Sequence, residues 1–201
     1  MTTREFWDWF ELNNKKYLFL NDVDIDVKEK FLDEFLTELH KYCDQLYFEI
    51  GGHPMDNNVE LIITAAGNTN VFNKVEELIG AAPVIKSWQF IAFKPAMGFD
   101  FSVDFYGQKF DPAEIWFLPL SSKAQPGTLG LRVYYKNFEE TLKKKFIAGT
   151  YHILDAGLGE KQTALNIKHV DVGLLPEQPE KNNLIRLKEL PAYINWFKTK
   201  N

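Results

Sequence analysis

Three side chains near a glycine-containing turn have the types that acid–base catalysis uses. His152 and Asp155 lie near the end of an expected helix, and Glu160 follows Gly157-x-Gly159. A histidine beside carboxylates can exchange protons or bind a metal ion. A histidine near a helix C-terminus is also stabilised by the helix dipole, which accounts for His152 without a function. We name His152, Asp155 and Glu160 as candidate catalytic residues, and we expect no cofactor and no metal site.

Two other histidines have potential partners. Glu49 and Asp56 flank the segment Gly51-Gly52-His53-Pro54, where a glycine-rich strand end could expose a histidine. Glycines beside a proline also form a tight turn without any chemistry. His40 and Cys43 could reach one ion from the same helix, but two ligands do not complete a zinc site. The turn, and a buried thiol beside a boundary histidine, are the preferred interpretations.

Two further patterns begin like ligand sites and then depart from them. Asp22-x-Asp24-x-Asp26 opens like a calcium loop, but Val27 stands where that loop needs glycine. Ala66-Gly67-Asn68-Thr69 joins a strand to a helix without the glycine spacing of a dinucleotide site or the lysine of a P-loop. A solvated turn and a helix cap explain these segments.

The elements that position these residues follow from the spacing of apolar side chains. Alternating or continuous apolar runs predict strands, and stripes with a spacing of three or four predict helices. The alternation slips near His169, which indicates a bulge or register change. We expect strands at 46–51, 59–65, 88–94, 100–105, 115–119, 129–135 and 163–171, helices at 3–13, 27–45, 71–81, 138–156 and from Leu190, and a further short strand at 17–20.

This order of elements predicts one α+β domain that covers residues 1–201. Its centre would be a largely antiparallel, mixed sheet of five to seven strands, and helices with one apolar stripe would pack on it. The sequence shows no internal repeat. The proline-containing segment at 173–183 resembles a linker, but it lies too near the C-terminus to separate two domains.

Composition narrows the class of protein. Hydrophobic residues make up 45% of the chain and charged residues 25%, which is typical of a soluble globular protein. The single cysteine, Cys43, excludes an intramolecular disulfide and fits a reducing compartment. The N-terminus carries charges where a secretion signal needs an apolar core, and no apolar run approaches the roughly 18 residues of a membrane span. We expect a cytoplasmic protein with no membrane partner.

Two stretches resemble a family of uncharacterised bacterial proteins. The first comprises ELIITAAG at 60–67, Ala82-Pro83 and WQFIAFKP at 88–95, and the second is ILDAGLGE at 153–160. That family has no established activity or site residues. The resemblance therefore implies no role for any residue of this chain.

Catalytic motifs are missing, and aromatic residues are abundant near both ends of the chain. The terminal aromatic residues are Trp7, Trp9, Phe10, Trp196 and Phe197. These observations favour a non-enzymatic protein-interaction or immunity-like protein, whose partner is another protein. The alternative is a small hydrolase or metal-dependent enzyme that uses His152, Asp155 and Glu160.

The net charge of −5 predicts negligible binding to duplex DNA or RNA at physiological salt. Nucleic-acid binding needs a basic face that releases counterions, and Lys143-Lys144-Lys145, the only basic run, would point in different directions on a helix. Fluorescence anisotropy with labelled duplexes measures this directly. A micromolar affinity that falls with added salt would contradict the prediction.

Overall fold

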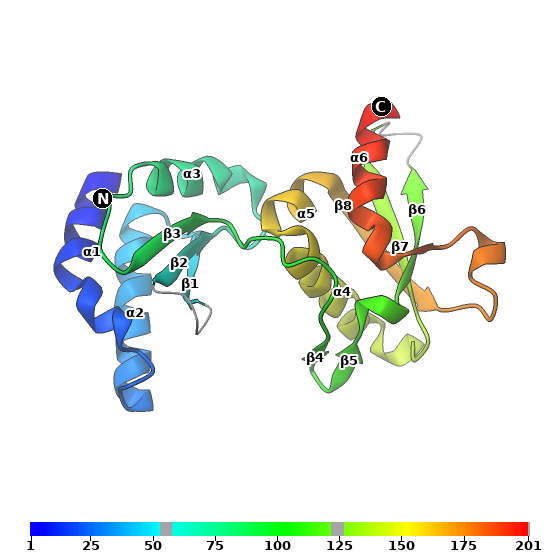
Figure 1. The fold of residues 1–201 in the computed structure, drawn as a ribbon, viewed down its shortest axis with the longest axis horizontal. Helices are drawn as coiled ribbons and strands as arrows, with labels where there is room; N and C mark the ends of the chain where they lie inside the picture. Colours follow the sequence, from blue (N-terminus) through cyan, green and yellow to red (C-terminus); the bar gives the residue numbers. More distant parts are fainter. Residues whose placement is uncertain (53–57, 122–126, 201) are drawn as a thin grey trace. The chain divides into compact units, whose positions relative to one another are not determined.

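The computed structural model describes residues 1–52, 58–121 and 127–200, and the chain divides into two compact units (Figure 1). Unit 1 comprises Met1–Lys94 and unit 2 comprises Pro95–Asn201. Each unit contains both helices and a sheet, so the predicted α+β class is confirmed.

Unit 1 is a three-stranded sheet with helices. Its strand order is β1-β2-β3, in which β1 pairs antiparallel with β2 and β2 pairs parallel with β3. The parallel pairing requires a crossover, which a 3₁₀ turn and helix α3 supply. The elements are α1 (Thr3–Leu18), α2 (Ile25–Tyr42), β1 (Tyr47–Gly51), β2 (Val59–Thr64), η1 (Thr69–Val71), α3 (Phe72–Gly80) and β3 (Trp88–Ala92).

Aromatic rings from α1 and α2 form a large part of the core of unit 1. Phe10 and Phe35 are fully buried, and their ring centroids lie 5.9 Å apart in an edge-to-face arrangement. The ring centroids of Phe35 and Phe48 of β1 lie 4.1 Å apart. Helix α2 therefore packs on the face of the sheet that carries Phe48. Trp7 Nε1 donates a hydrogen bond of 2.8 Å to the carbonyl of Leu78, which joins α1 to α3. Several of the N-terminal aromatic residues are therefore core residues.

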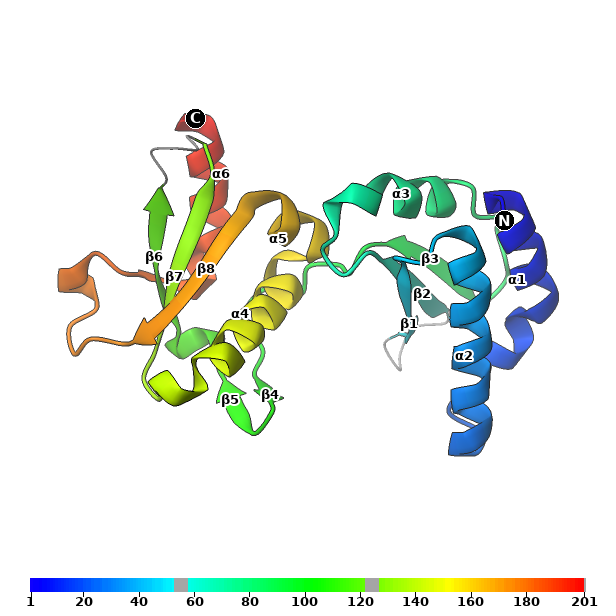
Figure 2. The same ribbon diagram turned by 180° about the vertical axis from the view of Figure 1, so that it is seen from behind.

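Unit 2 contains a small hairpin and a sheet (Figure 2). The sheet has four strands in the order β8-β7-β6-β9. Its core joins residues of β6, β7 and β8 with residues of α4 and α6. The elements are β4 (Val103–Phe105), β5 (Gln108–Phe110), η2 (Pro112–Glu114), β6 (Trp116–Ser121), β7 (Leu129–Tyr135), η3 (Glu140–Leu142), α4 (Lys143–Leu158), α5 (Glu160–Asn166), β8 (Ile167–Leu174), η4 (Glu180–Asn182), β9 (Ile185–Arg186), η5 (Leu187–Glu189) and α6 (Leu190–Lys200).

Two glycines of α4 let aromatic rings approach the helix backbone. A Cβ atom on Gly149 would lie 2.4 Å from the ring of Phe110, and one on Gly157 would lie 2.1 Å from the ring of Phe99. Both rings are nearly inaccessible to solvent. Because Gly149 and Gly157 have no side chain, the segment that carries Phe99 and Phe110 packs closely against α4.

The two units share one order of strands, although the sequence shows no repeat. In each unit an antiparallel pair is followed by a 3₁₀ turn, a helical crossover and a parallel strand. Thus β1, β2 and β3 of unit 1 correspond in topology to β6, β7 and β8 of unit 2. Unit 2 differs because a further strand, β9, pairs with β6.

The predicted central sheet of five to seven strands is wrong. The described strands form three separate sheets of three, two and four strands. The local patterns identified most of the strands, but they carry no information on which strands share a sheet. A single domain over residues 1–201 would require the two units to associate with each other. This stays a prediction.

Several local predictions also need correction. The segment 163–171 was expected to be one strand, yet Glu160–Asn166 forms α5 and only Ile167–Leu174 forms β8. The run at 17–20 is not a strand, because Tyr17 and Leu18 belong to α1. The predicted irregularity near His169 is confirmed, since the register of β7 with β8 shifts there. No helix in the described part of the chain is both long and apolar enough to cross a membrane.

Replacement of Gly157 by alanine should destabilise the protein by about 1–3 kcal/mol, because the new methyl group would overlap the buried Phe99 ring. Gly80→Ala is the matched control. Gly80 is also helical, and a Cβ atom there would meet no atom within 4 Å. Urea unfolding measures both variants. Equal stability of Gly157→Ala and the wild type would contradict this packing.

Candidate functional site

His152 and Asp155 lie on α4, one helical turn apart. The imidazole of His152 is exposed and stacks on the ring of Phe105, with 5.4 Å between centroids. Asp155 is half-buried. Burial raises the pKa of the neighbouring Tyr151 phenol, and the charge of Asp155 raises it further. An exposed histidine against an aromatic ring is explained by packing alone.

Glu160 has a different environment from His152. It is the first residue of α5, directly after Gly159, and its side chain is only 1% exposed. Among the described residues, no group of three or more histidine, cysteine, aspartate or glutamate side chains could hold a metal ion. The interpretation of His152, Asp155 and Glu160 as one catalytic site stays a prediction.

The other sequence candidates have structural roles where the structure describes them. His40 Nε2 lies 3.1 Å from the carbonyl of Leu46, and Cys43 caps the end of α2. The Asn68 side chain accepts a hydrogen bond from the Asn70 N–H, as expected for a helix cap. His53 and Asp56 lie outside the described residues.

A concavity of about 520 Å³ lies along β1 in unit 1. Every residue from Phe48 to Gly52 lines it, although successive side chains of a strand point to opposite faces. The concavity therefore meets the backbone edge of β1 as well as its side chains. We call it the β1 groove, and its lining residues are Tyr17, Leu18, Leu20, Asn21, Lys28, Leu32, Phe48, Glu49, Ile50, Gly51, Gly52, Asn58 and Val59.

Two backbone hydrogen bonds show which way β2 faces. The Val59 N–H donates to the Ser87 carbonyl, and the Phe93 N–H donates to the Ile63 carbonyl, both at 2.8 Å. The N–H and C=O groups of one strand residue point to the same side, and this side alternates along the strand. The N–H and C=O groups of the odd-numbered residues 59–63 therefore point toward β3. Those of the even-numbered residues point toward β1.

The register of β1 with β2 determines which backbone groups of β1 point toward β2 and which point outward. Phe48 lies opposite Ile63, and Ile50 lies opposite Leu61. The backbone groups of Ile63 and Leu61 point toward β3 and away from β1. Opposite residues of an antiparallel pair exchange either both hydrogen bonds or neither. Phe48 and Ile50 therefore direct their N–H and C=O groups outward from the sheet, whereas Glu49 bonds to β2. Within the described part of the chain, no strand pairs with this outer edge.

Apolar side chains form the helical side of the β1 groove. Leu20 is buried, and Leu18 and Leu32 are half-buried. Phe48 and Ile50, also half-buried, lie on the same face of β1. The groove thus combines outward-facing strand backbone, with which no strand of the described ranges pairs, with a partly accessible apolar wall.

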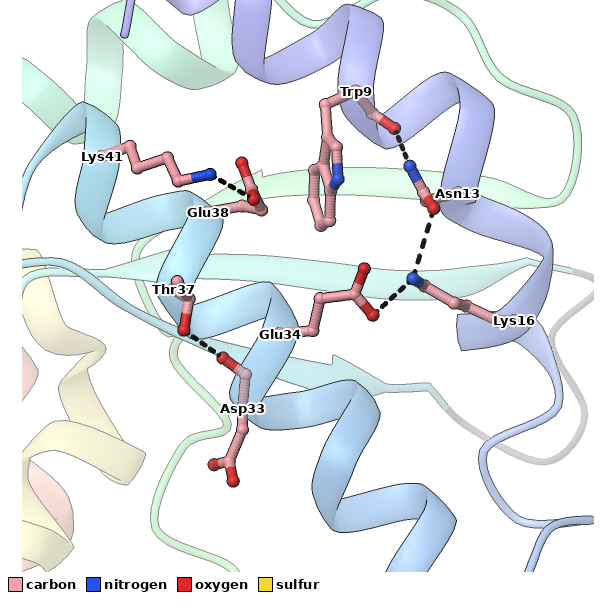
Figure 3. Close-up of polar contacts among 8 residues, drawn as sticks. All are labelled: Trp9, Asn13, Lys16, Asp33, Glu34, Thr37, Glu38 and Lys41. Carbon is pink, nitrogen blue, oxygen red and sulfur yellow. Dashed lines mark hydrogen bonds and ion pairs between the residues drawn. The ribbon is translucent and has the colours of Figure 1, made fainter.

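A lysine between α1 and α2 stabilises this wall (Figure 3). Lys16 Nζ lies 2.6 Å from Glu34 Oε2 and 3.2 Å from Asn13 Oδ1. The same ammonium group lies 5.9 Å from the Trp9 ring centroid and 5.3 Å from that of Tyr17, within the range of cation–π attraction. These contacts fix the last turn of α1, which contributes Tyr17 to the groove.

The Tyr17 phenol stays neutral at physiological pH. Burial raises its pKa strongly, and the carboxylates of Glu34 and Glu38 raise it further. Tyr17 therefore supplies bulk to the groove wall and carries no charge.

The acidic excess of the chain lies in unit 1. Residues 1–94 contain 16 acidic and 9 basic side chains, a net charge of −7, whereas residues 95–201 contain 12 acidic and 14 basic, a net charge of +2. Exposed aspartates lie between the groove residues Asn21 and Lys28, namely Asp22, Asp24 and Asp26. Lys28 also lines the groove, and the unit that surrounds it carries a net negative charge, which favours cationic partners.

Comparison with known proteins found no match among family models, curated proteins or solved structures. Inference about function therefore starts from the geometry of the chain. The β1 groove could not be predicted from reactive side chains in the sequence, because this groove depends on the direction of the strand backbone. The alternation of Phe48 and Ile50 before two glycines is the one local signal of an accessible strand.

Hydrogen exchange tests the assigned direction of the β1 backbone. The amide of Glu49 should exchange slowly because it bonds to β2, and the amides of Phe48 and Ile50 should exchange faster because they face outward. Amide exchange followed by NMR on the free protein measures all three in one sample. Protection of Phe48 and Ile50 above that of Glu49 would reverse the assignment.

Proposed function

We propose that this chain is a non-enzymatic protein-interaction protein that binds an extended segment of a partner at the edge of β1. The supporting observation is the outward direction of the Phe48 and Ile50 backbone groups into the β1 groove. Main-chain hydrogen bonds give affinity in strand addition, and pockets for alternate side chains give specificity. The apolar wall formed by Leu18, Leu20 and Leu32 would receive those side chains.

The proposal includes an immunity-like role, in which an acidic protein neutralises a basic partner. The net charge of −7 in unit 1 supports it, because complementary charge speeds encounter and excludes acidic partners. A cytoplasmic setting, which the single Cys43 favours, is part of the same proposal.

Hydrolysis at His152, Asp155 and Glu160 is the second hypothesis. His152 is exposed and Glu160 is buried, so their placement does not favour a shared catalytic surface. We rank strand addition first because three features coincide at β1: an edge with which no described strand pairs, an apolar wall, and a surrounding unit with a net charge of −7.

Selection from a library of displayed peptides against the full chain tests the proposal. The selected peptides should shift the NMR signals of Phe48–Gly52. Ile50→Pro removes one outward N–H and part of the apolar face but keeps the ladder to β2, so we expect binding to weaken about tenfold.

Ala92→Pro is the matched control. Ala92 lies on β3, the other edge strand, and its N–H also points away from the neighbouring strand because the next residue, Phe93, bonds to β2. This variant should bind selected peptides as the wild type does. Selected peptides that bind elsewhere, or that bind Ile50→Pro unchanged while circular dichroism confirms its fold, would refute the proposal.

A further inference from the structure

Unit 2 already contains a strand added at the edge that corresponds to β1. Strand β9 pairs antiparallel with β6, so that Trp116 lies opposite Arg186 and Phe117 lies opposite Ile185. The N–H of Leu187 donates to the carbonyl of Ile115 at 2.9 Å, which extends the pairing. The chain therefore shows, within its own fold, how a segment completes this type of edge.

The correspondence between β6 and β1 covers the residues at the start of each strand. Phe117 lies opposite Val133 in the β6–β7 pair, as Phe48 lies opposite Ile63 in the β1–β2 pair. The preceding residues also match in type, since Ile115-Trp116-Phe117 parallels Leu46-Tyr47-Phe48. Because the Ile115 carbonyl faces β9, the backbone groups of Phe117, two residues later, face β9 as well. The backbone groups of Phe48 face the outer edge of β1 in the same way.

The side chains of β9 show what such an edge accepts. The Arg186 guanidinium lies 4.4 Å from the Trp116 ring centroid, and Trp116 is only 7% exposed. Ile185, on the other face, packs against the core of unit 2. The segment thus combines an apolar residue that faces the core with a basic residue that covers an aromatic ring.

The corresponding ring in unit 1 is partly exposed, with the His40 ring edge-on at 6.2 Å between centroids. Tyr47 is 48% exposed, although Trp116 at the matching position is buried. Glu49, two residues later on the same face, is exposed and lies 2.5 Å from Lys94 in an ion pair. A cation placed over Tyr47 would meet an aromatic face next to a carboxylate, in the unit that carries the net negative charge.

We infer that the partner segment adds antiparallel to β1, with an apolar residue opposite Phe48 and an arginine or lysine opposite Tyr47. The inference rests on the proposed function and specifies its partner as a protein with an exposed apolar–basic–apolar strand. The apolar residue faces Leu18 and Leu32 in the β1 groove. The basic residue takes the position over Tyr47 that Arg186 takes over Trp116.

A labelled peptide with the sequence of residues 183–189, NLIRLKE, is the probe because it contains the β9 pattern. The full chain should bind it at Phe48–Gly52, and a peptide with glutamate in place of its arginine should bind at least about tenfold more weakly. Tyr47→Ala should weaken binding of the arginine peptide about threefold relative to the wild type. Tyr47→Trp should bind this peptide as tightly as the wild type or more tightly.

A nitroxide label at the peptide N-terminus reports its direction. Antiparallel addition places the label near Gly51 and Gly52 and broadens their NMR signals. Broadening at Leu46 and Tyr47 instead, or equal binding of the arginine and glutamate peptides, would overturn the inference. A dimer of the full chain that the free peptide dissociates would also overturn it, because the occupant would then be a second copy.

The two proposals fail in different ways. If library peptides bind at β1 without an antiparallel direction or a basic preference, only the inference about the partner is lost. If neither library peptides nor the NLIRLKE peptide perturb Phe48–Gly52, the proposed function is lost with it.

Discussion

Strand backbones carry N–H and C=O groups on two sides, and each group that leaves water needs a partner. In unit 2 this requirement is met at β6 by β9, on the side where Phe117 faces outward. In unit 1 the equivalent groups of Phe48 and Ile50 face the β1 groove, where no described strand pairs with them. An open edge favours association with other chains, which natural proteins limit or use.

Contacts of α1 and α2 hold the groove wall beside this edge. The ion pair between Lys16 and Glu34 holds the end of α1 against α2, and the Phe35 ring packs α2 on β1 through Phe48. The groove wall is therefore built on helices and a strand, whose positions are fixed by core packing. A preorganised wall lowers the entropic cost of binding an extended segment.

Sequence patterns predicted the individual helices and strands better than the arrangement of the strands in sheets. The alternation of Leu129 to Tyr135 gave β7 with correct bounds, because one face of that strand is buried throughout. The segment 163–171 was assigned to one strand because Thr163 and Leu165 continue an apolar pattern that short helices also show. The separation into three sheets, and the outward direction of Phe48, depend on pairing between distant segments, which no local pattern contains.

In the proposed function, β1 accepts a partner strand through the outward backbone groups of Phe48 and Ile50. Amide exchange of these two residues, measured with and without a saturating bound peptide, tests it most directly. We expect their exchange to slow by about tenfold or more in the complex, while Glu49, already bonded to β2, changes little. Tight peptide binding with unchanged exchange at Phe48 and Ile50 would contradict the account.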